Sequence, residues 1–213
     1  MDKPLISFVV PCWNRAHYLP DTIDSLLAQS LKEIEIIVVD DGSTDTTPYL
    51  MDWYVEKDKR INYIPVPHKG VGMARNIGNR EAKADIIATA DSDDIYHPDR
   101  AKITYKFFNR YHDIDGMYGT YLLADFWGQA TYKHPIKMAS EEHADKFVHS
   151  MSAFRTKVLL KEPYNEKIPY DIDGDLVRRL FKKEYRISFT KSVLGKVRYS
   201  AEGLSAIQHG VKK

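Results

Sequence analysis

The sequence predicts an α/β protein in which a mostly parallel sheet is flanked by helices. Short, almost entirely apolar segments alternate with segments of helical periodicity through the first 100 residues. Strands that are buried on both faces are typical of parallel sheets, and the helices between them provide the crossovers. A chain of 213 residues with 43% hydrophobic residues is long enough for one substantial core, so we expect a single domain.

Four strands are expected in the first part of the chain. Residues 5–10 form a nearly all-apolar segment that ends before Pro11, and residues 34–39 form a second one. Residues 61–66 predict a weaker third strand, which we place at the edge of the sheet because it contains a proline. The fourth strand, residues 86–90, ends abruptly in three carboxylates within four residues.

Helices are expected between these strands. Apolar residues recur at helical spacing from residue 18 to residue 29. Thr47-Pro48 opens a second helix, since proline suits the first helical turn. Residues 70–83 predict a loop that leads into a third helix, and residues 98–111 predict a fourth. This alternation indicates a Rossmann-like arrangement of residues 1–100.

The character of the chain changes after residue 100. One helix is expected here, at residues 173–183, and the apolar segments are less regular. Strands are expected at residues 117–123, 130–133, 152–154, 185–190 and 193–199. Residues 101–213 are therefore expected to form a mixed second half that shapes a second pocket.

Composition excludes several classes of function. The formal net charge of +1 provides no bulk attraction to nucleic acid or to anionic lipid. No segment of about 18 apolar residues could span a membrane, although peripheral contact with a membrane surface stays open. The single cysteine, Cys12, fits a reducing compartment, and residues 1–4 do not resemble a signal peptide. We therefore expect a soluble, cytoplasmic protein that does not bind nucleic acid.

Polar side chains follow three of the expected parallel strands. They are Asn14 and Arg15 after the first, Asp40 and Asp41 after the second, and residues 91–94 after the fourth. Parallel strands bring their carboxyl ends to one edge of the sheet, where ligands bind. The Asp-x-Asp spacing in residues 91–94 suits a hard divalent cation, although an acidic turn before the helix at Pro98 is the plainer alternative. A cation site facing a nucleotide pocket explains all three clusters together.

These segments resemble the motifs of the inverting family-2 glycosyltransferases, which have the GT-A fold. The matching segments agree in order and spacing; they are residues 9–15, 38–45, 72–78 and 91–94. The match is continuous from about Leu5 to Arg100 and sparse beyond. The resemblance implies a single GT-A domain over residues 1–213, with a nucleotide-sugar-binding half at residues 1–100 and an acceptor-binding half at residues 101–213.

The resemblance implies roles for five residues in binding the nucleotide. Asp41 would accept a hydrogen bond from the base, typically the imide N–H of uracil. Pro11 and Asn14 would line the same pocket, Arg75 would approach the base or the diphosphate, and Asp91 would lie near the ribose or the metal shell. The plainer alternatives are a helix N-cap or turn residue for Asp41, a plain turn for Pro11 and Asn14, and a surface arginine for Arg75.

The resemblance also implies a divalent cation, Mn²⁺ or Mg²⁺, held by Asp93 with Asp91 beside it. The leaving group departs as a nucleoside diphosphate, and a cation would neutralise its developing negative charge. Asp94 would cap the turn or contact the donor sugar.

A general base must come from the second half, because inversion in one displacement requires deprotonation of the acceptor hydroxyl. The family usually places this carboxylate at the start of a late helix. Asp175 matches that pattern best and Asp173 second, whereas Asp171 is expected to be a turn residue. Alternatively, all three simply favour the positive N-terminus of the helix.

Two histidines are further candidates. His149 lies in a segment that resembles the strand lining the acceptor side, but a structural histidine is an equal alternative. Many relatives have a histidine where this chain has Ser200, and its role there is to help hold the metal or diphosphate. His209 is expected to replace it if the tail folds back, or else to be solvated.

The sequence thus predicts transfer of a sugar from a UDP-sugar to a glycan, lipid-linked or other hydroxyl acceptor, with inversion and metal assistance. One alternative is a nucleotide-sugar-binding protein without turnover. Another is a nucleotidyltransferase, but the glycine-rich basic loop expected of that class is absent from residues 11–15. A dinucleotide fingerprint starting at Gly70 fails because Arg75 stands where glycine or alanine is required.

Overall fold

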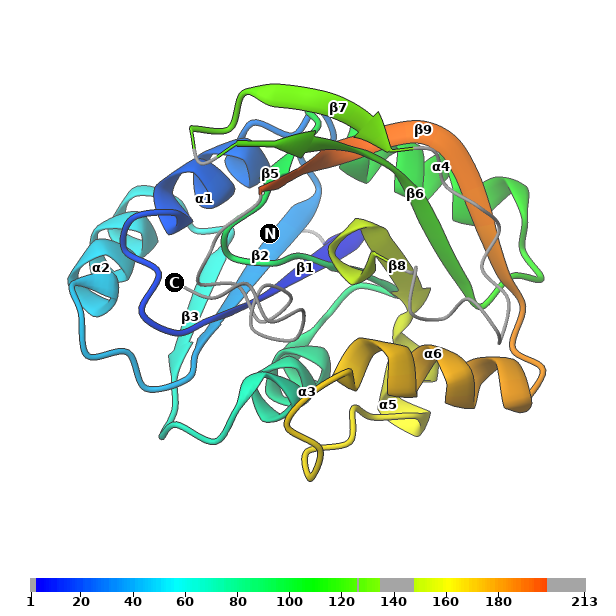
Figure 1. Cartoon of the computed structure of the whole chain (residues 1–213). Helices are drawn as coiled ribbons and strands as arrows, with labels where there is room; N and C mark the ends of the chain where they lie inside the picture. Colours follow the sequence, from blue (N-terminus) through cyan, green and yellow to red (C-terminus); the bar gives the residue numbers. More distant parts are fainter. Residues whose placement is uncertain (1–2, 126, 135–147, 199–213) are drawn as a thin grey trace.

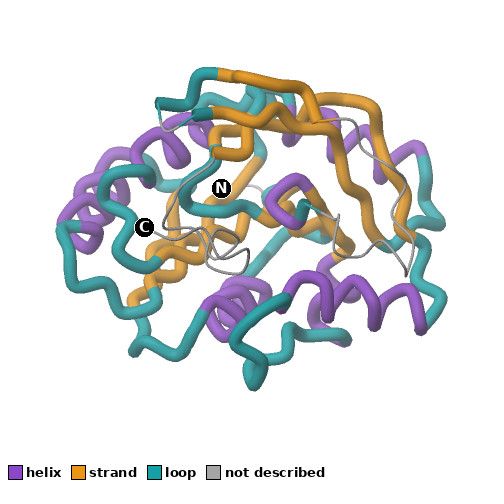
Figure 2. Tube along the Cα trace, in the orientation of Figure 1, coloured by secondary structure: helices purple, strands orange, loops and turns teal. Residues whose placement is uncertain are grey.

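The structure, a computed structural model, describes residues 3–125, 127–134 and 148–198. Its centre is a sheet of nine strands within these residues, in the order β3-β2-β1-β4-β8-β6-β9-β5, with β7 paired to β6. Helices lie on both sides of this sheet (Figure 1, Figure 2). The predicted α/β class and the mostly parallel first half are confirmed.

The first half of the sheet is parallel and buried. It contains β1 (Ile6–Cys12), β2 (Ile34–Asp40), β3 (Ile61–Pro65) and β4 (Ile86–Thr89). Every residue of β1, β2 and β4 is buried, as expected for strands covered on both faces. β3 lies at the edge, as its proline predicts. β1 continues through Pro11 to Cys12, two residues beyond the expected end, and Pro11 lies opposite Val39 of β2.

Helices divide between the two faces according to their apolar residues. The first face is covered by α1 (Leu19–Leu27), α2 (Thr47–Lys57) and α4 (Arg100–Arg110), which pack on one set of strand side chains. The opposite face is covered by α3 (Val71–Glu81), α5 (Thr156–Lys161) and α6 (Ile172–Lys182), as Figure 1 shows. None of the helices in the described residues is long and apolar enough to cross a membrane.

The second half of the sheet is mixed, as predicted. It contains β5 (Ile95–Tyr96), β6 (Gly116–Ala124), β7 (Ala130–His134), β8 (Ser152–Arg155) and β9 (Ile187–Arg198). β8 runs antiparallel to β4 and β6, whereas β9 runs parallel to β6. A short 3₁₀ helix, η2 (His149–Met151), precedes β8. Two strands expected at residues 185–190 and 193–199 form one strand, β9, because register shifts opposite β6 absorb the break between them.

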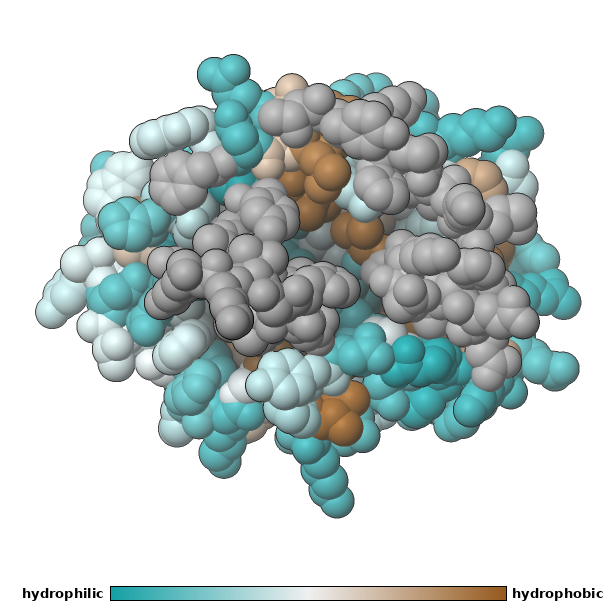
Figure 3. Space-filling view, in the orientation of Figure 1, coloured by the Kyte–Doolittle hydropathy of each residue, from teal (hydrophilic) through white to brown (hydrophobic). Residues whose placement is uncertain are grey.

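A close contact between α3 and the sheet fixes the depth of that helix. A Cβ atom at Gly78 would collide with the side chain of Val9 on β1, so only glycine permits this approach. The contact brings the first turns of α3 next to the carboxyl ends of β1, β2 and β4. Figure 3 shows the same side of the molecule as a surface, with mainly hydrophilic residues around its periphery.

Candidate functional site

An acidic turn, residues 91–94, follows β4 and leads into β5. The Asp91 N–H donates to the hydroxyl of Tyr96 over 2.7 Å, and this hydroxyl donates to the Asp91 carbonyl over 3.0 Å. Asp94 is buried and accepts a hydrogen bond from the backbone N–H of Arg198 at the end of β9. The buried Asp94 carboxylate thus links the acidic turn to the end of β9.

The other two carboxylates of the turn suit a cation. Burial, followed by the negative charge of Asp91, raises the pKa of Asp93 to about 6. Two carboxylates that repel each other in a partly buried turn are the oxygen donors that a hard divalent ion requires. No group of three or more His, Cys, Asp or Glu side chains suited to a metal occurs in residues 3–125, 127–134 and 148–198. An ion at Asp91 and Asp93 would need further ligands beyond those that residues 3–125, 127–134 and 148–198 bring together.

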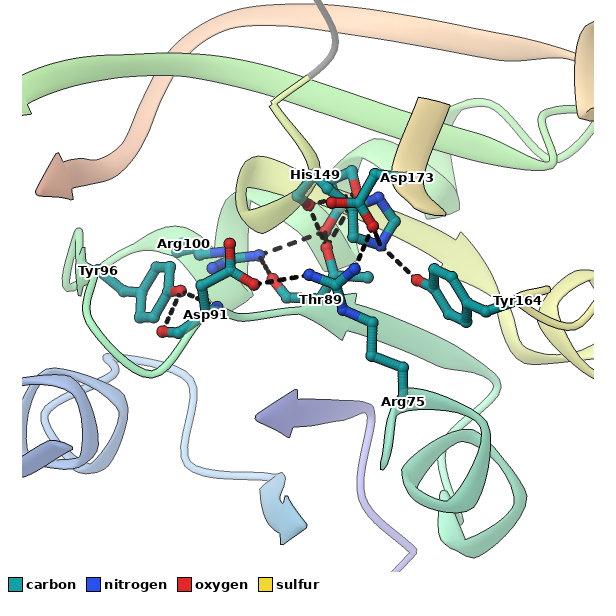
Figure 4. Close-up of polar contacts among 9 residues, drawn as sticks. Arg75, Thr89, Asp91, Tyr96, Arg100, His149, Tyr164 and Asp173 are labelled. Carbon is teal, nitrogen blue, oxygen red and sulfur yellow. Dashed lines mark hydrogen bonds and ion pairs between the residues drawn. The ribbon is translucent and has the colours of Figure 1, made fainter. Parts of the chain in front are cut away.

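Arg75 on α3 connects this turn to α6. Its Nη2 atom donates to Asp91 Oδ1 over 2.9 Å, and its Nη1 atom donates to Asp173 Oδ1 (Figure 4). The guanidinium carbon also lies 5.4 Å from the ring centroid of Tyr164. Arg75 is buried, which disfavours its charge, but Asp173 and Asp91 outweigh that effect and hold its pKa above the ordinary value. Arg75 is thus a buried ionic link and not a surface arginine.

The start of α6 separates the two candidate bases. Asp173 pairs with Arg75, whereas Asp175 accepts a hydrogen bond from Arg179 Nε over 2.8 Å. Residues two apart on a helix point about 200° apart, so the two carboxylates lie on different faces of α6. Partial burial raises the pKa of Asp173, and Arg75 opposes this rise. The structure therefore brings Asp173, and not Asp175, to the acidic turn.

His149 lies beside the same link but inside the core. Its Nε2 atom is hydrogen-bonded with the Tyr164 hydroxyl and lies 3.9 Å from Asp173 Oδ1. Its ring stacks on Phe154 with centroids 6.0 Å apart. Burial, followed by the charge of Arg75, lowers the pKa of His149 well below its ordinary value, so the ring is neutral near pH 7. This geometry fits the structural alternative for His149. Both Ser200 and His209 lie outside the described residues.

A second cluster forms at the ends of β1, β2 and β3. Asp41 is buried, and its carboxylate accepts hydrogen bonds from the N–H groups of Lys69 and Gly70, each over 2.8 Å. His68 Nδ1 lies 2.9 Å from Asp41 Oδ2. Asp41 therefore orders the loop that leads into α3, and Gly70 permits this loop because its φ of 103° is in the region that favours glycine.

Asn14 orders the neighbouring loops. Its Oδ1 atom accepts hydrogen bonds from the N–H groups of Thr44 over 2.8 Å and Asp45 over 3.3 Å. Its own N–H donates to Ser43 Oγ over 2.8 Å. Pro11 is buried within β1, directly before this region. Asn14 thus joins the ends of β1 and β2, and the structure places Pro11, Asn14 and Asp41 around one end of the sheet.

Sequence reasoning missed an aromatic pair in this cluster. The rings of Trp13 and His68 stack with centroids 4.7 Å apart at 24°. Trp13 is 47% exposed, although it is a large hydrophobic residue, and His68 contacts Asp41. An exposed aromatic face beside a carboxylate can bind a planar ring by stacking. The sequence signal was an aromatic residue between Pro11 and Asn14 at a strand end.

Comparison with known proteins defines the class of protein. The family model described as Glycosyl transferase family 2 matches residues 7–166. An uncharacterized glycosyltransferase of Rickettsia prowazekii is 31% identical over 211 residues, which cover 93% of this chain and 65% of that protein. Chondroitin synthase of Escherichia coli is 27% identical over 201 residues, which cover 90% of this chain and 29% of the synthase. The chain belongs to glycosyltransferase family 2, as the resemblance of its motifs implies.

Solved structures confirm the GT-A fold. S. aureus TarS 1-349 in complex with UDP superimposes with a TM-score of 0.75 at 22% identity, covering 92% of this chain and 61% of that one. A mannosyltransferase of Pyrobaculum calidifontis in complex with GDP-Man and Mn²⁺ gives a TM-score of 0.75 at 17% identity, covering 97% of this chain and 60% of that one. The chain thus spans less than two thirds of the length of these relatives.

Proposed function

We propose that this family-2 glycosyltransferase transfers a sugar from a UDP-sugar to a hydroxyl acceptor, with inversion and with the help of a divalent cation. The observation that carries the proposal is the Arg75 link, in which one guanidinium contacts both Asp91 and Asp173. Arg75 thereby holds Asp91 of the acidic turn close to Asp173 of the second half. Single displacement requires such an arrangement, in which one group helps to stabilise the leaving group and a nearby carboxylate is the general base.

The nucleotide would bind at the ends of β1 to β3. The exposed face of Trp13 offers a stacking surface for the nucleobase, and Asp41 Oδ1 has a further lone pair for an imide N–H beside its hydrogen bond from the Lys69 N–H. Asn14 would support this pocket through the loops that it orders, and Pro11 would line the pocket from β1. The UDP and UDP-GlcNAc bound by TarS support a uridine donor, whereas the GDP-Man bound by the Pyrobaculum enzyme makes guanosine the alternative.

The cation would be Mn²⁺ or Mg²⁺ held by Asp93 and Asp91, with the donor diphosphate completing its ligands. The donor set fits, because both groups are carboxylates, and the pKa of Asp93 is raised first by burial and then by the negative charge of Asp91. When bound, the ion neutralises the charge that develops on the leaving diphosphate. The Mn²⁺ in the Pyrobaculum structure supports this assignment. Asp94 would support the turn from the interior.

Asp173 is the base that the geometry favours, in place of the expected Asp175. It lies at the N-terminus of α6, 34% exposed, on the side of the helix that meets Arg75 and Asp91. Its carboxylate would accept the proton of the acceptor hydroxyl as that oxygen attacks the anomeric carbon. The acceptor, a glycan, a lipid-linked sugar or another hydroxyl compound, would bind against residues 101–213, and the nucleotide sugar against residues 1–100.

The test is UDP release from a panel of UDP-sugars, with and without Mn²⁺, in the presence of a mixed acceptor pool. We expect UDP release that requires Mn²⁺, occurs with one UDP-sugar of the panel and requires one class of acceptor. Metal-dependent donor binding without transfer to any acceptor would instead indicate a nucleotide-sugar-binding protein. Pyrophosphate release from UTP and a sugar phosphate would indicate a nucleotidyltransferase.

A further inference from the structure

Arg100 is a buried cation that lies beside the acidic turn at residues 91–94 (Figure 4). It is the first residue of α4 and is fully buried. Its Nη2 atom donates to the carbonyl of Thr89, the last residue of β4, and to the Ser152 carbonyl over 3.2 Å. Within the described part of the chain, its Nε and Nη1 atoms have no hydrogen-bond partner. A guanidinium is protonated at any ordinary pH, so this is a permanent buried charge.

The remaining contacts of Arg100 are aromatic. Its guanidinium carbon lies 4.3 Å from the ring centroid of Tyr96 and 5.3 Å from that of Phe8. Cation–π contact compensates only part of the loss of water. The Tyr96 hydroxyl, in turn, accepts a hydrogen bond from the Asp91 N–H and donates one to the Asp91 carbonyl. Arg100 therefore contacts the chain before the acidic turn through Thr89 and after it through Tyr96.

Burying the Arg100 guanidinium costs free energy unless nearby negative charges compensate for the lost water. No ion pair between described residues includes Arg100, and an unpaired buried charge is strongly destabilising. The turn at residues 91–94 contains three carboxylates that repel one another, and two of them, Asp94 and Asp91, interact electrostatically with Arg100. A fixed positive charge beside them offsets this repulsion, and the effect is large where water is excluded. Arg100 is thus a counter-charge beside the acidic turn, in addition to Arg75, which pairs with Asp91.

We propose that Arg100 and Tyr96 are positioning residues for the cation site. Tyr96 fixes the backbone of Asp91, and Arg100 fixes Tyr96 and the end of β4 while providing the counter-charge. The turn is then already in its binding conformation when the metal and the nucleoside diphosphate arrive. This inference rests on the proposed function, because it assumes that Asp91 and Asp93 bind the cation.

The first test compares Tyr96→Phe with the wild-type protein and with Tyr54→Phe. Tyr54 is a matched control, because it is buried and its hydroxyl donates to Asp24 Oδ1 over 2.9 Å, between α2 and α1. Calorimetry measures UDP and GDP binding with and without Mn²⁺. For Tyr96→Phe we expect unchanged metal-free binding and a Mn²⁺-dependent gain in affinity that is reduced about tenfold. Tyr54→Phe should keep the full gain despite a similar loss in Tm.

The second test uses Arg100→Lys and Arg100→Met, which separate charge from packing. Arg100→Lys keeps the charge and should retain part of the Mn²⁺-dependent gain, whereas Arg100→Met should lose it while metal-free binding persists. An unchanged gain in Tyr96→Phe, or equal gains in the two Arg100 variants and the wild type, would overturn the inference. Absence of any metal-dependent gain in the wild-type protein would instead overturn the proposed cation site, and this inference with it.

Discussion

Arg75 Nη2 lies 2.9 Å from Asp91 Oδ1, and the other terminal nitrogen of the same guanidinium contacts Asp173. These three residues come from α3, from the turn after β4 and from the start of α6, which are far apart in the sequence. The link therefore exists only in the folded protein. The sequence had assigned these residues to three separate roles. Arg75 was expected to contact the nucleobase or the diphosphate, Asp91 to lie near the metal, and Asp173 to be a candidate general base.

The assignment of Asp173 as the general base is tested by Asp173→Asn, with Asp175→Asn as the matched control on the same helical turn. We expect Asp173→Asn to lose turnover by about 10²–10⁴-fold while donor binding stays within a few-fold, because an amide cannot accept the proton. Asp175→Asn removes only a partner of Arg179 and should retain most of its turnover. Steady-state rates and calorimetry of UDP binding measure both effects. The opposite ranking of the two variants would return the role to Asp175.

The Arg75 link is tested by Arg75→Lys and Arg75→Met. Lysine keeps the charge but cannot contact two carboxylates in one plane, so we expect lower turnover with a nearly wild-type Tm. Methionine leaves Asp91 and Asp173 unpaired, and we expect a loss of about 1–3 kcal/mol in the free energy of unfolding, less than for a fully buried pair because both carboxylates are partly exposed. Urea unfolding measures this loss. A methionine variant with wild-type stability and turnover would show that the link has no role.

The aromatic pair is tested by Trp13→Ala. Loss of a stacking surface for a base costs about 1–3 kcal/mol, so metal-free UDP affinity should fall by about tenfold or more. Trp53→Ala is a matched control, because Trp53 is also exposed but lies on α2. Equal UDP affinity in both variants would show that the uracil ring does not stack on Trp13. Trp13→Phe should recover most of the affinity, since it restores an aromatic face.

The sequence predicted most of the fold because apolar periodicity reports burial directly. All four parallel strands and the mixed second half follow from it, and the proline of β3 predicted its edge position. The β9 strand was divided in the prediction because Lys191 and Ser192 break the apolar pattern, whereas register shifts opposite β6 accommodate them. Local patterns contain no information on such long-range pairing.

The site was predictable only where it coincided with motifs. Motif spacing placed Asp91, Asp41 and Arg75 at one edge of the sheet, but it could not say which carboxylate of α6 points there. The motif pattern favoured Asp175 over Asp173, but both lie in the first turn of α6, and it is the contact of Asp173 with Arg75 of α3 that distinguishes them. Tyr96 and Arg100 were missed for a similar reason, since a tyrosine and an arginine beside a helix start have no distinctive pattern.

The pH dependence of cation binding follows from Asp93. The pKa of this carboxyl is raised to about 6 by burial and by Asp91, and a cation must displace its proton. Apparent Mn²⁺ affinity, measured through UDP binding, should therefore be constant above about pH 7 and fall by up to about tenfold per pH unit below about 6. A profile without a break near pH 6 would contradict the assignment of Asp93.

The lowered pKa of His149 predicts how the free energy of unfolding depends on pH. Its pKa is lowered in the folded protein by burial and by Arg75, so below pH 6.5 the unfolded chain binds a proton that the folded protein does not. Stability from this residue is complete above about pH 7.5 and is lost as pH falls below 6.5, by up to about 1.4 kcal/mol per pH unit. Asp94 and Asp173, whose pKa values are raised, act in the opposite sense.

The informative quantity is therefore the difference in unfolding free energy between the wild-type protein and His149→Phe, measured by urea unfolding from pH 5 to pH 8. We expect the advantage of the wild type to shrink steadily towards pH 5, and a difference that does not vary with pH would show that His149 takes up a proton within the fold.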